Sequence, residues 1–311
     1  MLAPQLSAFL ASVRRRIATV PAARDALGLR ARVRRTIAAA LGFAATLALL
    51  AGAGVTAHAH WSRLRAPPAL VLEVAPGENF VSAITALHAA RGAAANRFDD
   101  RALFATGALR RREALFLAGM ETTGAIALNA MPVARGASHV DLADARALAS
   151  SLDLADRPRL TAALARLAAA QARGDVRFNR DALGLTAMAS AAAIDLELRA
   201  EAIAAQTGEG AVTPRAEASF YSVRGAAYGW AAILRAAAAD AHDPSLADAW
   251  GPALASLDRV ADAAPLFLSN GDPIGVLRPN HLVSVGLELE LAAADLRRFA
   301  DSAAALSASA N

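Results

Sequence analysis

The sequence predicts an all-α protein in which an N-terminal single transmembrane helix precedes a bundle-like extracytoplasmic domain of about eight helices. One observation is a run without charged residues at positions 36–57, and another is the helical spacing of apolar residues through the rest of the 311-residue chain. The composition agrees, because 56% of the residues are hydrophobic, 19% are charged and the mean hydropathy is +0.34. These values exclude a disordered, highly charged chain and are typical of a membrane-associated protein.

Residues 1–35 are predicted to form a basic cytoplasmic amphipathic arm. They contain eight arginines and one aspartate, while the whole chain carries a formal net charge of only +4, so the remaining residues are slightly acidic. A nucleic-acid-binding protein would carry its positive charge on the folded body, and we therefore expect no nucleic-acid partner. Three interpretations of the arm stay open: a helix in the membrane interface, a docking helix for a cytoplasmic partner and a solvated arm. The apolar residues of the arm are spaced as on one helix face: Leu2, Leu6, Phe9, Leu10, Val13, Ile17 and Val20.

Residues 36–57 are predicted to form a signal-anchor helix that spans a lipid bilayer. A helix of this length extends about 33 Å at about 1.5 Å per residue, which is enough to cross a hydrocarbon core of about 30 Å. Arg34 and Arg35 precede the segment and Trp61 follows it, as expected at the two membrane surfaces. The excess of arginine before the segment predicts a cytoplasmic N-terminus and a C-terminal domain on the other side of the membrane.

Two alternatives to an uncleaved anchor are a cleavable signal peptide and a buried core helix. The sequence Ala-His-Ala at positions 57–59 fits a signal-peptidase site, but the uncharged run is longer than the usual apolar region of a signal peptide. We therefore favour the anchor. A row of small residues along the segment suits pairing of two such helices in lipid, which would give a homo-oligomer: Ala40, Ala44, Ala48 and Gly52.

The rest of the chain is predicted to contain an extended linker at 58–78 and one helical domain at 79–311. Residues 69–74 form the only segment whose pattern favours a strand, and every later segment has helical periodicity. In the last helix an apolar stripe predicts core packing: Leu282, Val285, Leu289, Leu296 and Phe299. The predicted helices are 79–95, 99–131, 141–151, 157–173, 179–206, 214–240, 245–264 and 281–306.

Tyr221, Arg224 and Tyr228 are predicted to share one helix face, where they form a candidate ligand-binding group. A guanidinium between two phenols can bind a phosphate, a carboxylate or a sugar through charge-assisted hydrogen bonds. The alternative is a packing face whose rings are buried and whose hydroxyls reach water. Gly225 and Gly229 lie on the same helix, and glycine within a helix indicates that another backbone packs closely there.

The segment from Asn270 to His281 is the second candidate ligand-binding site. Asn270 and Asp272 belong to turn-forming dipeptides, and Asn280 stands in the N-cap position of the last helix. His281 would lie in the first turn of that helix, where the helix dipole favours a neutral imidazole. Beside Asn270 and Asp272 such an imidazole can act as a general base, although turn formation and capping explain the same residues.

Other chemical sites find little support in the sequence. The chain has no cysteine, which excludes thiol nucleophiles, disulfides and cysteine-ligated metals. Asp240, His242 and Asp243 lie too close in sequence to form a recognised metal site. We find no phosphate-binding loop, nucleophile elbow or zinc-protease motif. The sequence therefore favours a non-enzymatic protein, and we expect neither a cofactor nor a metal.

Three C-terminal segments resemble the signatures of a proteobacterial family of single-span inner-membrane proteins that is catalogued as a domain of unknown function. They are residues 220–228 (FYSVRGAAY), 268–272 (LSNGD) and 279–282 (PNHL), and weaker matches occur at 135–142 and 179–183. The middle of the chain differs from the family's pattern by alanine substitutions, so the resemblance implies a divergent member. The resemblance implies a short cytoplasmic tail, one inner-membrane span and a periplasmic helical domain, and it assigns no reaction.

Together these observations favour a periplasmic helical protein, anchored in the bacterial inner membrane, that acts as a scaffold or adaptor for an envelope protein partner. One alternative is a module that binds a lipid or a cell-wall fragment through Arg224, Tyr221 and Tyr228. A second alternative is a hydrolase or lyase that uses His281 with Asp272 or Asn270.

Overall fold

A computed structural model describes residues 41–49, 77–97, 107–151, 156–207, 212–243, 248–263, 265, 268–270 and 280–309. The chain divides into two compact units, Met1–Val55 and Thr56–Asn311. In the first unit, residues 41–49 form a helix in which the Thr46 hydroxyl donates a hydrogen bond of 2.8 Å to the Gly42 carbonyl. Within the described ranges, no helix combines the length and the apolar character needed to span a membrane.

Most of the predicted N-terminal organisation lies outside the described residues. The arm at 1–35, both ends of the 36–57 segment and the linker up to residue 76 belong to this part of the chain. The predicted strand at 69–74 lies there too. The signal-anchor, its orientation and its pairing face therefore stay predictions.

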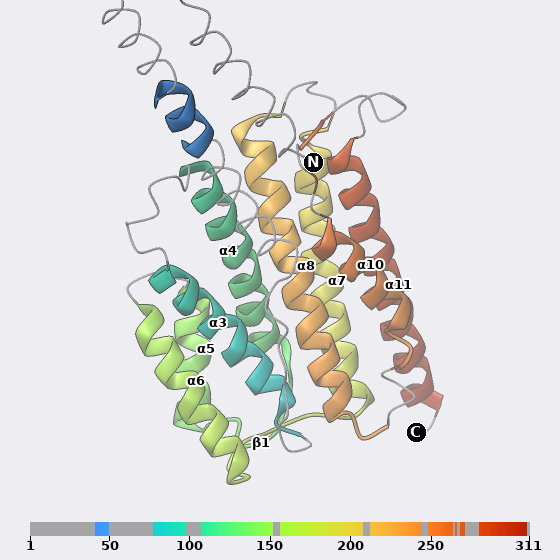
Figure 1. Ribbon diagram of the computed structural model, residues 1–311. Helices are drawn as coiled ribbons and strands as arrows, with labels where there is room; N and C mark the ends of the chain where they lie inside the picture. The colour runs from blue at the N-terminus through green and yellow to red at the C-terminus, as the bar shows by residue number, and fades with distance from the viewer. Residues whose placement is uncertain are drawn as a thin grey trace, which may run out of the picture. The chain divides into compact units, whose positions relative to one another are not determined.

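The described residues of the second unit are all-α apart from two short strands, which confirms the all-α part of the predicted fold class (Figure 1). The main difference in helix bounds is that the 99–131 helix is described from Gly107 and the 245–264 helix from Gly251. The helices are α3 (Asn79–Arg97), α4 (Gly107–Ala130), α5 (Val140–Ser151), α6 (Arg157–Ala172), α7 (Ala182–Ala204), α8 (Pro214–Asp240), α10 (Gly251–Asp262) and α11 (His281–Ser309).

The prediction that every segment beyond residue 74 is helical is wrong at two places. Strand β1 (Val133–Arg135) pairs in antiparallel fashion with β2 (Arg177–Phe178), with an irregular register. Each strand is too short to show the alternation that marks a strand in a sequence. The pairing depends on a tertiary contact instead: Gly136 has a φ of +78°, and a Cβ there would overlap the carbonyl oxygen of Asp175, just before β2.

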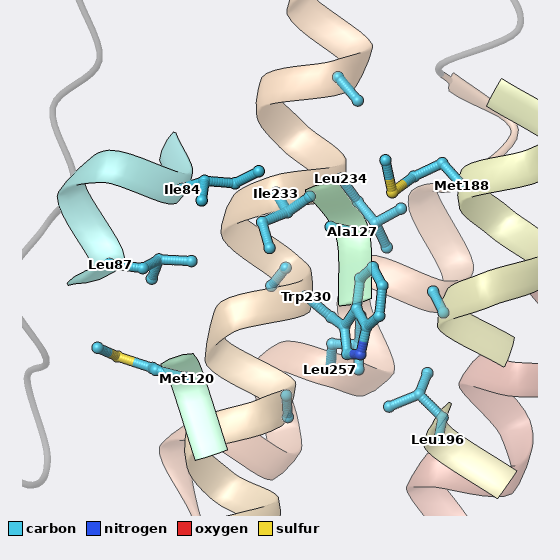
Figure 2. Close-up of a cluster of buried hydrophobic side chains, with 14 of the residues drawn as sticks. Ile84, Leu87, Met120, Ala127, Met188, Leu196, Trp230, Ile233, Leu234 and Leu257 are labelled. Atoms are coloured by element: carbon cyan, nitrogen blue, oxygen red, sulfur yellow. The ribbon is translucent and has the colours of Figure 1, made fainter. Parts of the chain in front are cut away.

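Helix α8 lies at the centre of the second unit, in contact with α3, α4, α7 and α10. Figure 2 shows Trp230 projecting from α8 toward Leu196 of α7 and Leu257 of α10. On the other side of α8, Ile84 and Leu87 of α3 point toward it (Figure 2). Because few aromatic residues are available, this core is filled mainly by aliphatic side chains and alanine from several helices.

Helices α4 and α8 approach so closely that their backbones touch at glycine. A Cβ at Gly225 would overlap the carbonyl oxygen of Phe116, and a Cβ at Gly119 would overlap that of Ser222. A Cβ at Gly229 would overlap the hydroxyl of Thr123. These contacts confirm the prediction that another backbone packs against Gly225 and Gly229.

The start of α3 is fixed by the last residue of α8, Asp240. Its carboxylate accepts hydrogen bonds from the backbone amides of Gly77 (2.7 Å), Asn79 (3.2 Å) and Phe80 (2.9 Å). It also accepts one from the Asn79 side chain at 2.8 Å. The first amides of a helix have no partner within the helix, so Asp240 caps α3 from a distant part of the chain.

The apolar stripe predicted on the last helix is buried as expected. Leu282, Val285, Leu289, Leu296 and Phe299 of α11 all belong to the core. Helices α7 and α11 pack side by side in opposite directions, because Glu197 pairs with Arg297 while Ile203 lies against Gly286.

Candidate functional site

Arg224, the centre of the first candidate group, is buried in the bundle, with 1% of its surface exposed. Its Nε and Nη2 atoms donate hydrogen bonds to the carbonyl oxygen of Ala261, at 3.2 and 2.6 Å. The guanidinium also lies over two aromatic rings, 5.8 Å from the centroid of Phe116 and 5.9 Å from that of Tyr221. Arg224 therefore joins α8 to α4 and to the C-terminal end of α10.

Burial shifts the titration of both buried members of this group. It lowers the pKa of Arg224 to about 10, because the low-dielectric interior disfavours the cation. Burial also raises the pKa of the Tyr221 phenol. A second cation, that of Arg112, lies 5.4 Å from the centroid of the Tyr221 ring.

The structure brings Tyr221 and Arg224 together, but in a packed interior. Tyr228 is partly buried and packs against Phe116, with ring centroids 6.0 Å apart. The buried rings match the packing alternative more closely than a site open to a ligand.

In the second candidate group, the residues on either side of positions 271–279 pair with each other. Asn270 and Asn280 form an isolated β-bridge, and the Asn280 side chain donates to the Asn270 side-chain oxygen at 3.2 Å. The Asn270 amide group in turn donates to the carbonyl oxygen of Gln206 at 2.8 Å. Asn280 also caps α11, since its side-chain oxygen accepts from the amide of Val283 at 3.0 Å, which confirms the predicted N-cap.

His281 lies beside this bridge and is bonded twice to Ser269. The Ser269 amide donates to Nδ1 of His281 at 3.0 Å, and the His281 amide donates to the Ser269 carbonyl at 3.1 Å. A neutral ring that accepts at Nδ1 carries its proton on Nε2. The lone pair that a general base needs is therefore already engaged. Burial lowers the pKa of His281, and its proposed partner Asp272 lies outside the described residues.

Asp240, one of the three residues that lie too close in sequence to form a recognised metal site, bonds to the start of α3. Over the described ranges, no group of three or more histidine, aspartate or glutamate side chains is placed to hold a metal. The oxygens of Asp240 instead receive the amide hydrogen bonds of α3.

A buried polar network that was not predicted from the sequence links three helices. The indole of Trp230 donates to the Asp195 carboxylate, and Arg199 pairs with the same carboxylate at 2.8 Å. Arg199 also donates to the Thr122 hydroxyl of α4 at 3.3 Å. The available signal was an aspartate that follows an apolar run, AAAI, at the centre of a predicted helix.

A second missed feature is a polar cleft of about 280 Å³, which we call the arginine cleft. Its lining residues belong to the end of α6, to strand β2 and to the start of α3 and their adjoining turns. These residues come from positions far apart in the sequence, so no sequence motif predicts the cleft. They are Gly77, Glu78, Gln171, Ala172, Arg173, Gly174, Arg177, Phe178 and Arg180.

A larger hollow of about 400 Å³ lies between α5 and α6, and its charged groups pair with one another. Arg166 bonds to Asp141 and Asp144, and Arg159 bonds to Asp156. The arginine cleft is the stronger candidate, because two of its arginines form no ion pair with any described residue.

Comparison with known proteins leaves the family resemblance a prediction. No protein-family model, curated protein or solved structure matches this chain.

Proposed function

We propose that this chain is a non-enzymatic scaffold or adaptor of the bacterial envelope. Residues 36–57 would anchor it in the inner membrane, and the helical domain would face the periplasm. The observation that carries the proposal is that the buried charged side chains of the candidate regions hold helices together. Arg224 binds a backbone carbonyl of α10, Asp195 binds Trp230 and Arg199, and Asp240 caps α3.

An exposed apolar face on α7 and α11 supports an adaptor. Leu198 is 59% exposed and Leu291 is 45% exposed, and both lie between the two contacts that hold α7 against α11. Ile194 and Leu287 are exposed on the same two helices. Ile194 and Leu198 lie four residues apart on one face of α7, as Leu287 and Leu291 do on α11. We infer that these exposed residues belong to a protein interface.

The partner we propose for this face is an apolar helix of an envelope protein with basic flanking residues. Glu201 and Glu290 are exposed on the same helices, and their charges complement such flanks. The slightly acidic charge of the residues after the arm favours the same kind of partner.

The scaffold is tested by affinity capture from crosslinked membranes. Full-length protein is compared with a Leu198→Asp, Leu291→Asp variant and with an Arg215→Ala control, whose side chain is exposed at the start of α8. We expect one stoichiometric partner that the control retains, that the double variant loses, and that rebinds as a purified protein. Recovery of a second copy of this chain, of lipid or glycan alone, or of a partner that the double variant retains would overturn the adaptor proposal.

The topology is tested with single cysteines, because the chain has none of its own. A Ser302→Cys variant reports on exposed α11, and a Ser12→Cys variant reports on the arm. We expect a membrane-impermeant maleimide to label the first variant in spheroplasts and the second only after lysis. Labelling of Ser12→Cys in intact spheroplasts would contradict the proposed orientation.

A further inference from the structure

The arginine cleft gathers positive charge on one small surface. Arg173, Arg177 and Arg180 line it, together with a single carboxylate, Glu78. Arg173 pairs with Asp175 at 2.9 Å. In the described part of the chain, Arg177 and Arg180 form no ion pair, and Glu78 pairs with neither of them.

Two glycines with left-handed backbone conformations lie against the guanidiniums of Arg177 and Arg180. Gly77 has a φ of +98°, and a Cβ there would overlap Nη1 of Arg180. Gly174 has a φ of +76°, and a Cβ there would lie 3.3 Å from Nη2 of Arg177. Both guanidiniums therefore lie directly against the backbone at the cleft, in places where side chains would displace them.

A third arginine, Arg135, places a further positive charge beside Arg177. Arg135 of β1 is the register partner of Arg177 of β2. Like charges directly opposite each other on paired strands destabilise a sheet. An anion bound at Arg177 would reduce this repulsion.

Gln171 holds the two sides of the cleft together at the end of α6. The residue is buried, with 8% of its surface exposed, and it lines the cleft. Its side-chain nitrogen donates a hydrogen bond to the Gly77 carbonyl, so the glycine beside Arg180 is tied to α6.

We propose that the arginine cleft binds a phosphate monoester. A phosphate monoester has a charge of about −1.5 to −2 at neutral pH, which matches two unpaired guanidiniums better than a single carboxylate does. Guanidiniums bind phosphate oxygens in a bidentate manner. The volume of about 280 Å³ admits a phosphate with a short polyol. This inference does not depend on the scaffold proposal.

The test is calorimetric titration of the full-length protein in a non-ionic detergent. Glycerol 1-phosphate probes a free phosphate monoester, and dihexanoyl phosphatidic acid probes a lipid headgroup of the same chemistry. We expect saturable binding of at least one probe with a Kd below about 1 mM, weakened about tenfold or more in an Arg177→Ala, Arg180→Ala variant. The matched control, Arg215→Ala, should bind like the wild type.

Each outcome decides the proposal. Binding of glycerol 1-phosphate that depends on the two arginines supports a free ligand, and binding of phosphatidic acid alone with the same dependence supports a lipid headgroup. No saturable binding of either probe, or equal binding by the double variant, overturns it. Circular dichroism checks that the variants fold. Should the double variant unfold, Arg177→Ala alone repeats the comparison at an exposed residue.

Discussion

The indole N–H of Trp230 donates a hydrogen bond of 2.7 Å to the carboxylate of Asp195, which joins α8 to α7 inside the core. Arg199 pairs with the same carboxylate and reaches Thr122 on α4. Three helices therefore share one nearly buried charge in an interior built mostly from aliphatic side chains and alanine. A buried charge is tolerated only while it is paired and hydrogen-bonded, so this network fixes the relative placement of the three helices.

Replacing Asp195 with alanine should destabilise the protein by about 3 kcal/mol, because it leaves the Trp230 indole and the Arg199 guanidinium without their partner. The free energy of unfolding is measured in urea by circular dichroism. Asp258 pairs with Arg235 at an exposed site, and Asp258→Ala should cost less than about 1 kcal/mol. Equal losses in the two variants would contradict a structural role for the buried network.

Adding one methyl group at Gly225 should cost more than about 2 kcal/mol, because the new Cβ overlaps the Phe116 carbonyl and forces α4 and α8 apart. Gly286→Ala is the matched control in α11, where the nearest atom, a methyl carbon of Ile203, would lie at an ordinary 3.6 Å. That substitution should stabilise the helix by about 0.5–1 kcal/mol. Thermal unfolding of both variants measures the contrast, and a neutral Gly225→Ala would refute the close approach.

Removing the Asp240 carboxylate should loosen the start of α3, because Asp240→Ala leaves the amides of Gly77, Asn79 and Phe80 without their acceptor. We expect a loss of about 2 kcal/mol and faster hydrogen exchange confined to the first turns of α3. His242→Ala, at an exposed neighbouring residue, serves as the control and should exchange like the wild type. Unchanged exchange in Asp240→Ala would show that another group caps α3.

Lowering the pH should reduce the free energy of unfolding through His281, which bonds to Ser269. Burial lowers the pKa of His281 in the folded protein below the value of about 6.5 for an unfolded chain. Between those two values the unfolded chain binds more protons, so stability is highest above about pH 6.5 and falls as the pH drops through the folded pKa.

His281→Asn tests this pH dependence, since an asparagine oxygen can accept from the Ser269 amide but does not titrate. The free energy of unfolding, measured from about pH 7.5 to about pH 5, should fall more steeply for the wild type than for His281→Asn. Parallel curves would remove His281 as the source of the pH dependence.

The helices of this protein are predictable because each buries one face against a core and so repeats its apolar residues every three or four positions. The N-cap at Asn280 and the close packing at Gly225 are also predictable, since both are local requirements of a single helix. The strands β1 and β2 are not, because Val133 and Phe178 meet through a pairing between distant segments.

The surroundings of the candidate residues depend on similar distant contacts. Arg224 resembles a surface cation in the sequence, yet its acceptor is the carbonyl of Ala261, 37 residues away. The arginine cleft joins Gly77 to Arg180, and no spacing within one helix relates them. Single-chain periodicity therefore finds the helices, while the environment of each charged side chain depends on how those helices pack.

The bridge between Asn270 and Asn280 gives the protein a natural point for insertion. The Asn270 side chain donates a hydrogen bond to the Gln206 carbonyl, and Asn280 caps α11, so both residues of the pair are held in place. A fluorescent domain whose own termini lie close together, introduced between residues 271 and 279, would connect at a single anchored position. The helices on either side would keep their packing, so the molecule could be followed in living cells without altering either end of the chain.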